Sequence, residues 1–312
     1  MRPGPRERAR LGLAAALLAS ACGARAPASE TESWTERSTE ERSSAMYREL
    51  GVAPRLLHLD RAVVRFVDLA PRGPRRGPGP RPEEALVLVH GIHGSAGDFA
   101  PVVLELAGRE RVVAVDLPGF GGSVRADDDY SIDAYVRFLG AFTRRLGLER
   151  VHLVCHSLGG QICLGAALHD PEWLGSLTLI DAAGIYEPGE FVRRVSKRLA
   201  RISVGRLTTG SGRTLFDAIA SNGPVMRRVA VRSAPTLAAL SSFSESYRHR
   251  VDEIDAPTLI IWGDEDPIFR VDDAFTLLEN IPGARLHIVP RAGHAPQLDR
   301  PRLVAGWIRD HL

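Results

Sequence analysis

Short apolar runs alternate with amphipathic stretches from residue 55 to the end of the chain. Several of these runs are almost wholly apolar, which is typical of parallel strands that helices cover on both faces. The pattern predicts eight strands, at residues 55–60, 62–70, 85–90, 112–116, 151–155, 177–181, 258–262 and 285–289. Strands that alternate with helices favour an α/β fold, with a mostly parallel eight-stranded sheet and helices on both faces.

Two of the stretches outside the strands carry clear helix signals. Ser131 is a good N-cap residue, and Pro301 suits the first turn of a helix. An apolar stripe with helical spacing follows each of them, formed by Ile132, Val136, Leu139, Phe142 and Leu146 in the first case and by Val304, Trp307 and Ile308 in the second. Both segments are therefore predicted to be amphipathic helices.

Residues 185–255 interrupt the alternation of strands and helices. This interval of about 70 residues has helical character and is too long for a single crossover connection. It carries twelve basic residues against seven acidic ones, so we expect a small, basic second domain. Its segment 191–202 has the pattern of an amphipathic helix, whose basic face either meets solvent or lies on an anionic membrane surface.

The first 21 residues resemble a secretory signal. Four arginines precede an uncharged apolar run at residues 11–21, which is shorter than the ~20 apolar residues that a membrane-spanning helix needs. The run ends in Ala-Ser-Ala before Cys22, a sequence similar to the lipidation site of bacterial lipoproteins. Cleavage there would leave a lipidated Cys22. Gly23 stands where an aspartate would retain a lipoprotein in the inner membrane, so the outer membrane is favoured.

Plain signal cleavage is the alternative, and it would give a periplasmic or secreted protein. Residues 22–50 are predicted to be the lipid anchor and a flexible tether. The stretch 28–44 is rich in Ser, Thr and Glu, with Trp34 as its one large apolar residue, so it cannot bury enough surface to offset the entropy of ordering.

The composition of the chain limits the kinds of partner and cofactor that we expect. A net charge of +2 over 312 residues is too small to indicate a nucleic-acid partner. The three cysteines, Cys22, Cys155 and Cys163, are too few for a disulfide framework and lack the spacing of metal ligands. We therefore predict no metal and no cofactor, and we interpret Cys163 as a small buried hydrophobe.

Candidate catalytic residues follow the ends of two predicted strands. The sequence CHSLGG at 155–160 follows one strand and opens a helix, which places Ser157 on a sharp turn with its hydroxyl exposed. Cys155 takes the place of the first glycine of the pattern G-x-S-x-G. The glycine-flanked loop HGIHG at 90–94 follows another strand. We predict that the backbone N–H groups of Ile92 and Leu158 form an oxyanion hole beside Ser157.

Five blocks together resemble the α/β-hydrolase superfamily in order and spacing: HGIHG (90–94), DLPGFGGS (116–123), CHSLGG (155–160), WGDEDP (262–267) and AGHAPQLDRP (292–301). The resemblance implies a catalytic triad of Ser157 as nucleophile, Asp266 as acid and His294 as base. It also implies a hydrolase domain at 51–312, with 185–255 as a helical cap.

Other polar residues in or near these blocks are alternative or supporting candidates. Asp264 and Asp181 are rival candidates for the acid, because Asp264 lies two residues from Asp266 and Asp181 ends a predicted strand. The remaining histidines of the blocks, His90, His93 and His156, are interpreted as structural or pocket-lining. The glycine-rich block that begins at Asp116 is interpreted as a tight turn, since neither a dinucleotide fingerprint nor a P-loop lysine accompanies it.

The predicted function is that of a serine hydrolase acting on carboxylic esters, of the lipase or carboxylesterase type, with a small-molecule ester or lipid as substrate. A serine nucleophile excludes the mechanisms that rest on an aspartate nucleophile. Two alternatives stay open. One is a carbon–carbon bond hydrolase, which uses the same three residues, and the other is a non-catalytic hydrolase-like module that binds a lipid or an envelope protein.

Overall fold

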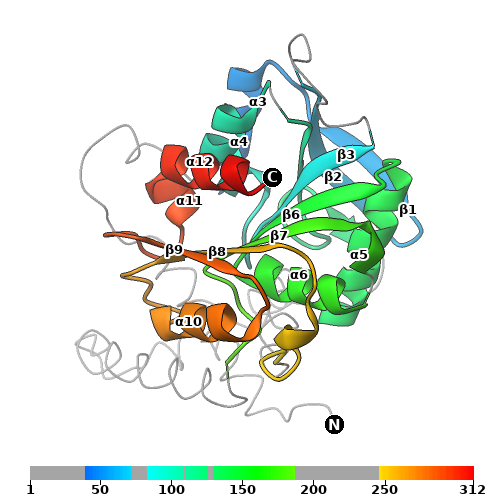
Figure 1. The fold of residues 1–312 in the computed structure, drawn as a ribbon. Coiled ribbons are helices and arrows are strands. Elements are labelled where there is room, and N and C mark those ends of the chain that lie inside the picture. The colour runs from blue at the N-terminus through cyan, green and yellow to red at the C-terminus, as the bar shows by residue number, and fades with distance from the viewer. Residues whose placement is uncertain (1–38, 72–82, 109, 126–128, 170, 187–245) are drawn as a thin grey trace, which may run out of the picture.

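The computed structural model describes residues 39–71, 83–108, 110–125, 129–169, 171–186 and 246–312. Within this part of the chain a nine-stranded sheet has the order β1-β2-β4-β3-β6-β7-β8-β9, and β5 pairs with β2 outside that path. Strands β1 and β2 run antiparallel to their neighbours, and the six from β4 to β9 along the order are parallel. All eight predicted strands are present, and the predicted fold class is confirmed (Figure 1).

The eight long strands have the bounds β1 Arg55–Leu59, β2 Ala62–Leu69, β3 Glu84–Val89, β4 Val112–Val115, β6 Arg150–His156, β7 Leu174–Ile180, β8 Thr258–Gly263 and β9 Arg285–Val289. The strand that the sequence pattern missed is β5, Val124–Arg125, which has only two residues and therefore no periodicity to read. Because β3, β6, β8 and β9 are parallel, the segments that follow them meet at one edge of the sheet.

Helices cover both faces of the sheet, as Figure 1 shows. One face packs against α5 (Ile132–Arg145), α6 (Leu158–His169) and α10 (Val271–Asn280), and the other against α3 (Thr39–Leu50), α4 (Ala100–Leu106) and α12 (Pro301–His311). The side chains of β3 alternate between the two cores, with Val87 in the first and Leu88 in the second. Both predicted amphipathic helices are present as α5 and α12, and the Ser131 hydroxyl caps α5 by accepting the N–H of Ala134 at 3.2 Å.

Residues 39–50 differ from the expectation of a flexible tether. They form α3, whose Met46 is fully buried and whose Leu50 is 4% exposed in the core beside α4. The polar composition of 28–44 concealed this helix, because three well-placed apolar side chains (Ala45, Met46 and Leu50) are enough to dock it. The folded body therefore begins before residue 51. The predicted signal segment, Cys22 and the rest of the tether lie outside the described residues.

Only the two ends of the predicted cap insertion are described. Residues 187–245, which include the predicted helix at 191–202, lie outside the described residues. Tyr247, Val251 and Ile254 are buried in the same core as α6, so residues 246–255 pack with the sheet and its helices. The loop 72–82 also lies outside the described part. Among the described helices, none combines the length and the apolar character needed to cross a membrane.

Candidate active site

Ser157 occupies a sharp turn between β6 and α6. Its backbone φ of +53° lies in the left-handed region, which costs a residue with a side chain about 1–3 kcal/mol. Backbone hydrogen bonds hold this conformation, because Ser157 N donates to Ile180 O at 3.1 Å and Ser157 O accepts from Gly160 N at 2.9 Å. A Cβ on Gly159 would lie 2.3 Å from the carbonyl oxygen of Val89, so this position requires glycine. The turn holds the serine at the carboxyl edge of the sheet.

The three residues of the predicted triad lie in one hydrogen-bonded chain. His294 Nε2 is 3.0 Å from Ser157 Oγ, and His294 Nδ1 is 2.8 Å from Asp266 Oδ2. Ser157 is 4% exposed, and the side chains of His294 and Asp266 are 6% and 0% exposed. This geometry fits a neutral imidazole that donates its Nδ1 proton to Asp266 and leaves Nε2 to accept the serine proton.

Asp266 is fixed through its other carboxylate oxygen. Oδ1 accepts the backbone N–H groups of Ile268 at 2.7 Å and Phe269 at 3.1 Å, which is a local turn that aspartate side chains commonly form. Oδ2 is therefore directed to His294. Asp264, the nearest rival, is exposed to solvent on the same loop. The structure brings Asp266 to the histidine and leaves Asp264 outside the chain of hydrogen bonds.

The backbone that carries His294 is held on both sides. Gly293 N donates to Asp299 Oδ2 at 3.0 Å, and His294 O accepts a hydrogen bond from His156 Nε2 at 2.6 Å. Phe269 meets the imidazole edge to face, with ring centroids 5.3 Å apart. These contacts leave the ring little freedom to turn away from Ser157.

The loop 90–94 lies against the elbow. Gly94 N donates to Gly91 O at 3.1 Å, which closes a tight turn with Ile92 at its second position. A Cβ on Gly91 would lie 2.9 Å from Ser157 Cβ, so only glycine lets the loop backbone come this close. Leu158 is the first residue of α6, and its N–H has no acceptor within the helix. The structure therefore brings both predicted oxyanion residues next to the serine.

His90 and His93 shape this loop. Leu117 N donates to His90 Nε2 at 2.9 Å, so the ring carries its proton on Nδ1 and donates it to Gly91 O at 2.6 Å. His93 has a φ of +60°, as the third position of this turn requires. Asp116 supports the loop from the next strand by accepting Ala96 N at 2.7 Å. These contacts indicate that His90, His93 and Asp116 have a structural role in the loop.

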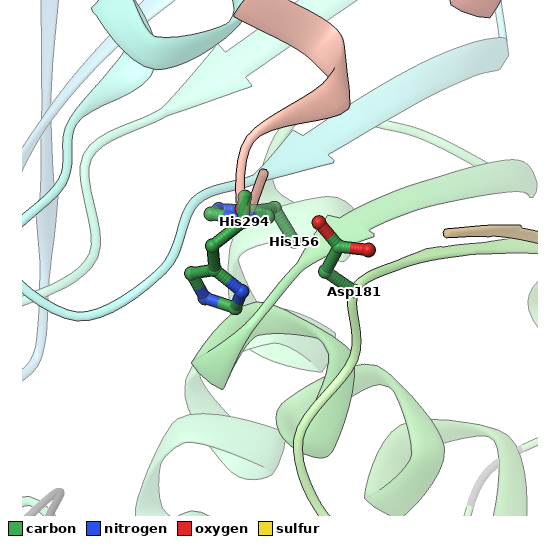
Figure 2. Close-up of side chains that lie close together, drawn as sticks. All are labelled: His156, Asp181 and His294. Carbon is green, nitrogen blue, oxygen red and sulfur yellow. The ribbon is translucent and has the colours of Figure 1, made fainter. Parts of the chain in front are cut away.

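The triad histidine also belongs to a second cluster of polar side chains. His156, Asp181 and His294 each offer one atom of a type that binds metals, and these atoms lie within 4.8 Å of one another (Figure 2). Both ring nitrogens of His294 are engaged by Ser157 and Asp266, and His156 Nε2 is engaged by His294 O. Among the described residues, His156 Nδ1 and Asp181 Oδ2 have no hydrogen-bond partner, but a metal ion held by all three residues would have to displace a hydrogen bond of the His294 ring. The cluster therefore fits the support of the triad better than metal binding.

Burial sets the protonation of the two supporting residues. Burial lowers the pKa of His156 well below its usual value, and the proximity of the second imidazole, His294, lowers it further because two protonated rings would repel each other, so the His156 ring stays neutral. Burial raises the pKa of Asp181 well above its usual value, and the neighbouring Asp266 raises it further. Asp181 accepts the N–H of Gly263 at 2.9 Å. The His294 ring is hydrogen-bonded to Asp266 instead, so Asp181 is a neighbour of the triad and not its acid.

Asp181→Asn is expected to make the protein more stable at alkaline pH. The native state holds the Asp181 proton more tightly than the unfolded chain, so the wild type loses stability as pH rises above about 4, by at most ~1.4 kcal/mol per pH unit, until the raised pKa is passed. Asparagine resembles the neutral acid, tolerates the φ of +42° and does not ionise. Urea unfolding should find the two proteins similar near pH 4 and the variant more stable at pH 8.

Asp264→Asn is the matched control, because it also replaces a carboxylate by an amide but at an exposed position. If Asp181→Asn and the wild type lose stability in parallel as pH rises, the raised pKa of Asp181 is refuted.

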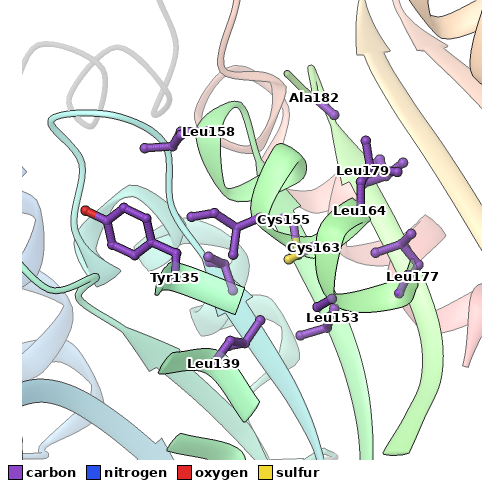
Figure 3. Packing of buried hydrophobic residues seen from close by; sticks show 14 of the residues in the cluster. Tyr135, Leu139, Leu153, Cys155, Leu158, Cys163, Leu164, Leu177, Leu179 and Ala182 are labelled. Atoms are coloured by element: carbon purple, nitrogen blue, oxygen red, sulfur yellow. A yellow bond between two sulfur atoms is a disulfide. The ribbon is translucent and has the colours of Figure 1, made fainter. Parts of the chain in front are cut away.

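Cys155 and Cys163 form a disulfide, with Cα atoms 6.5 Å apart. Cys163 is buried in the apolar core, as predicted, but it is also paired in a disulfide that the sequence analysis did not predict, and Cys155 does more than replace a small glycine. The physical reason is the elbow itself, which folds α6 back along β6 and brings together residues that are eight apart in the sequence. Both side chains are fully buried among the apolar residues of β6 and α6 (Figure 3). The bond links the strand before Ser157 to the helix after it.

Ser157 stands on a strand-to-helix elbow and is hydrogen-bonded to His294, which is in turn hydrogen-bonded to Asp266. The histidine and the aspartate follow later strands of a mostly parallel sheet, and this arrangement defines hydrolases of the α/β class. Residues 86–307 match the alpha/beta hydrolase family. The chain belongs to that family.

Known relatives within the family differ in the reactions for which they are named. The chain is 30% identical over 257 residues to a monoacylglycerol lipase, abhd6-A of Xenopus laevis, which covers 75% of this chain and 76% of the relative. It is 31% identical over 254 residues to a 2-hydroxy-6-oxononadienedioate/2-hydroxy-6-oxononatrienedioate hydrolase of Paraburkholderia phymatum, which covers 74% of this chain and 87% of the relative. A crystal structure of a putative lipase from Acinetobacter baumannii has the same fold, with a TM-score of 0.66, 23% identity and coverage of 92% and 97%.

Proposed function

We propose that the protein is a serine hydrolase that cleaves carboxylic esters, of the lipase or carboxylesterase type, through an acyl-enzyme on Ser157. The observation that carries the proposal is the hydrogen-bonded chain from Ser157 through His294 to Asp266. A serine hydroxyl is a weak nucleophile until an imidazole accepts its proton, and the imidazole needs a carboxylate to hold its tautomer.

The reaction follows from this geometry. His294 Nε2 takes the Ser157 proton as the hydroxyl oxygen attacks the ester carbonyl, and Asp266 stabilises the imidazolium that forms. The negative charge on the carbonyl oxygen is received by the N–H groups of Ile92 and Leu158. His294 then gives the proton to the leaving alcohol, and the acyl group stays on Ser157. A water molecule, deprotonated by His294, releases the acid and restores the serine.

Two observations support an ester or lipid substrate. The named activity of abhd6-A is that of a monoacylglycerol lipase, and its similarity extends over three quarters of this chain. Tyr186 and Phe269 stack with ring centroids 5.8 Å apart, and Phe269 also contacts His294. This buried aromatic pair makes the surroundings of His294 apolar, which is compatible with an apolar acyl group at the triad.

Carbon–carbon bond hydrolysis is the second candidate. The similarity to the Paraburkholderia phymatum hydrolase favours it, because that relative is named for a dienedioate substrate and is 31% identical to this chain. The same serine, histidine and aspartate serve both reactions. The two candidates therefore differ in the substrate and not in the triad.

We further propose that the mature protein begins at a lipidated Cys22 in a bacterial cell envelope, with the outer membrane favoured over the inner one. The proposal rests on the arginines, the apolar run and the small residues that precede Cys22. The Cys155–Cys163 disulfide supports an envelope location, because such bonds form and persist in oxidising compartments such as the periplasm. Cleavage without lipidation would give a periplasmic or secreted protein.

Cys22 is expected to be the first residue of the mature chain and to carry acyl chains. Several chains together would hold the protein on a membrane, whereas one gives only marginal binding. Intact-mass analysis of the mature N-terminus measures this directly, and Cys22→Ala should abolish the added mass. An unmodified chain that begins at another residue would refute the proposal.

A fluorophosphonate probe and a substrate screen test the function itself, on protein that lacks residues 1–22. Labelling at Ser157 and hydrolysis of p-nitrophenyl esters and monoacylglycerols are expected. Faster turnover of a 2-hydroxy-6-oxodienoate than of any ester would favour the second candidate. Absence of labelling would favour the non-catalytic binding module.

A further inference from the structure

Helix α3 packs directly on the segment that follows the loop 90–94. That segment is the short helix η1, Ala96–Phe99, whose N-cap residue is Ser95. The Ser43 hydroxyl of α3 lies 2.8 Å from the Ser95 hydroxyl, and both side chains are buried. A Cβ on Gly97 would lie 2.3 Å from Ser43 N, so the two backbones are in close contact. Helix α3 therefore meets η1 without an intervening side-chain layer.

An ion pair makes the second link between α3 and η1. Arg42 donates to Asp98 Oδ1 from Nε at 3.1 Å and from Nη2 at 2.5 Å, and the side chains of the pair are only 12% and 10% exposed. Asp98 Oδ2 accepts the N–H of Ser95 at 3.1 Å, which completes the cap of η1. A pair so shielded and held by two hydrogen bonds is a fixed structural element.

Asp98 also contacts the turn that carries Ile92. A Cβ on Gly94 would lie 2.3 Å from Asp98 Oδ2 and 2.9 Å from Gly91 O, so the carboxylate packs against the turn formed by residues 91–94. The contacts thus run from α3 through Asp98 and Ser95 to the turn that lies against Ser157 and carries Ile92, whose N–H is the predicted oxyanion donor. On its other side the same loop is tied to the segment that follows β4, because Leu117 N donates a hydrogen bond to His90.

We propose that α3 positions the oxyanion loop, and that Arg42 and Ser43 are positioning residues that act through Asp98 and Ser95 on the N–H of Ile92. This inference rests on the proposed serine-hydrolase function and deepens it, because it assigns a part in catalysis to a helix that precedes the first strand. Neither residue touches the substrate. Loss of either contact lets the turn relax, which weakens the hydrogen bond to the oxyanion of the transition state and leaves the triad intact.

The full chain carries the test, with Ser43→Ala and Arg42→Gln as variants and Arg42→Lys as the conservative replacement. Ser44→Ala and Arg48→Gln are matched controls, because these residues lie on the exposed side of the same helix. Ser43→Ala and Arg42→Gln should lower kcat for p-nitrophenyl butyrate by about tenfold, less than the 10²–10³ that loss of a whole oxyanion donor costs, with KM unchanged. Arg42→Lys should recover part of that loss, and the controls should match the wild type.

Three further readouts separate positioning from general damage. The inhibition constant of a trifluoromethyl ketone, which forms a tetrahedral oxyanion on the serine, should rise by the same factor as kcat falls. The midpoint of the pH profile of kcat should not move, since His294 is untouched. Thermal unfolding shows whether each variant is folded at the assay temperature, and Ser43→Ala is the milder change should Arg42→Gln unfold.

The rate of fluorophosphonate labelling keeps the two proposals apart, since it needs the triad and the oxyanion hole but no ester substrate. A wild type that is labelled but hydrolyses no ester overturns the ester proposal, and the ratio of labelling rates then tests α3. If Ser43→Ala stays within twofold of Ser44→Ala in kcat, in the inhibition constant of the ketone and in the rate of labelling, the proposed role of α3 is overturned. A fall in kcat without a change in ketone inhibition also overturns it.

Discussion

Replacing Ser157 by alanine is expected to lower kcat for ester hydrolysis by about 10⁴-fold to 10⁶-fold, the range seen when the nucleophile of a comparable triad is removed. The change removes one oxygen atom from a side chain that is 4% exposed, so the fold should persist. His294→Ala should cost a similar factor because no group remains to accept the serine proton. Asp266→Asn should cost about 10³–10⁴, since the amide no longer favours the required tautomer. Steady-state kinetics with p-nitrophenyl butyrate measure all three.

The triad acts as a unit, so the double variant Ser157→Ala/His294→Ala should be no slower than Ser157→Ala alone. Asp264→Asn is the control for the acid, because Asp264 lies on the same loop but is exposed. Near-normal turnover in Ser157→Ala would refute the nucleophile. Greater damage from Asp264→Asn than from Asp266→Asn would refute the assignment of the acid.

The strands and the residues of the candidate site could be predicted because strong local signals mark them. Parallel strands that are buried on both faces are mostly apolar, and residues 85–89 of β3 and 153–155 of β6 follow this rule. The turns at strand ends need particular residues, such as Gly159 where a Cβ would strike Val89 O. Since the site is built at one edge of a parallel sheet, these turns also locate Ser157, Asp266 and His294.

Features that depend on contacts between distant segments could not be predicted in the same way. Helix α3 could not be predicted from its polar sequence, because many of its contacts with the rest of the protein are themselves polar. Arg42 bonds to Asp98, and Ser43 bonds to Ser95. No periodicity reveals a partner that lies more than 50 residues away. The protonation of Asp181 likewise follows from burial beside Asp266, which only the folded chain creates.

The disulfide is another feature that only the folded chain reveals. Its removal is the second change for which we expect a large effect. The double variant Cys155→Ala/Cys163→Ala is expected to lose about 2.5 kcal/mol of unfolding free energy, because the bond restricts a closed loop of eight residues in the unfolded chain. Both side chains are fully buried, and alanine is smaller than cysteine, so a small cavity adds to the loss. Activity at 25 °C should stay within a few-fold of the wild type, because Gly159 and the backbone hydrogen bonds of Ser157 still hold the elbow.

Urea unfolding with and without dithiothreitol gives the matched comparison. The reductant opens the bond once the chain is unfolded, so it should lower the unfolding midpoint of the wild type and leave that of the double variant unchanged. If dithiothreitol does not change the urea midpoint of the wild type, the two cysteines are not joined in solution. A loss of activity as large as that of Ser157→Ala, in a double variant that remains folded, would mean that the clamp across the elbow sets the orientation of the nucleophile as well as the stability of the fold.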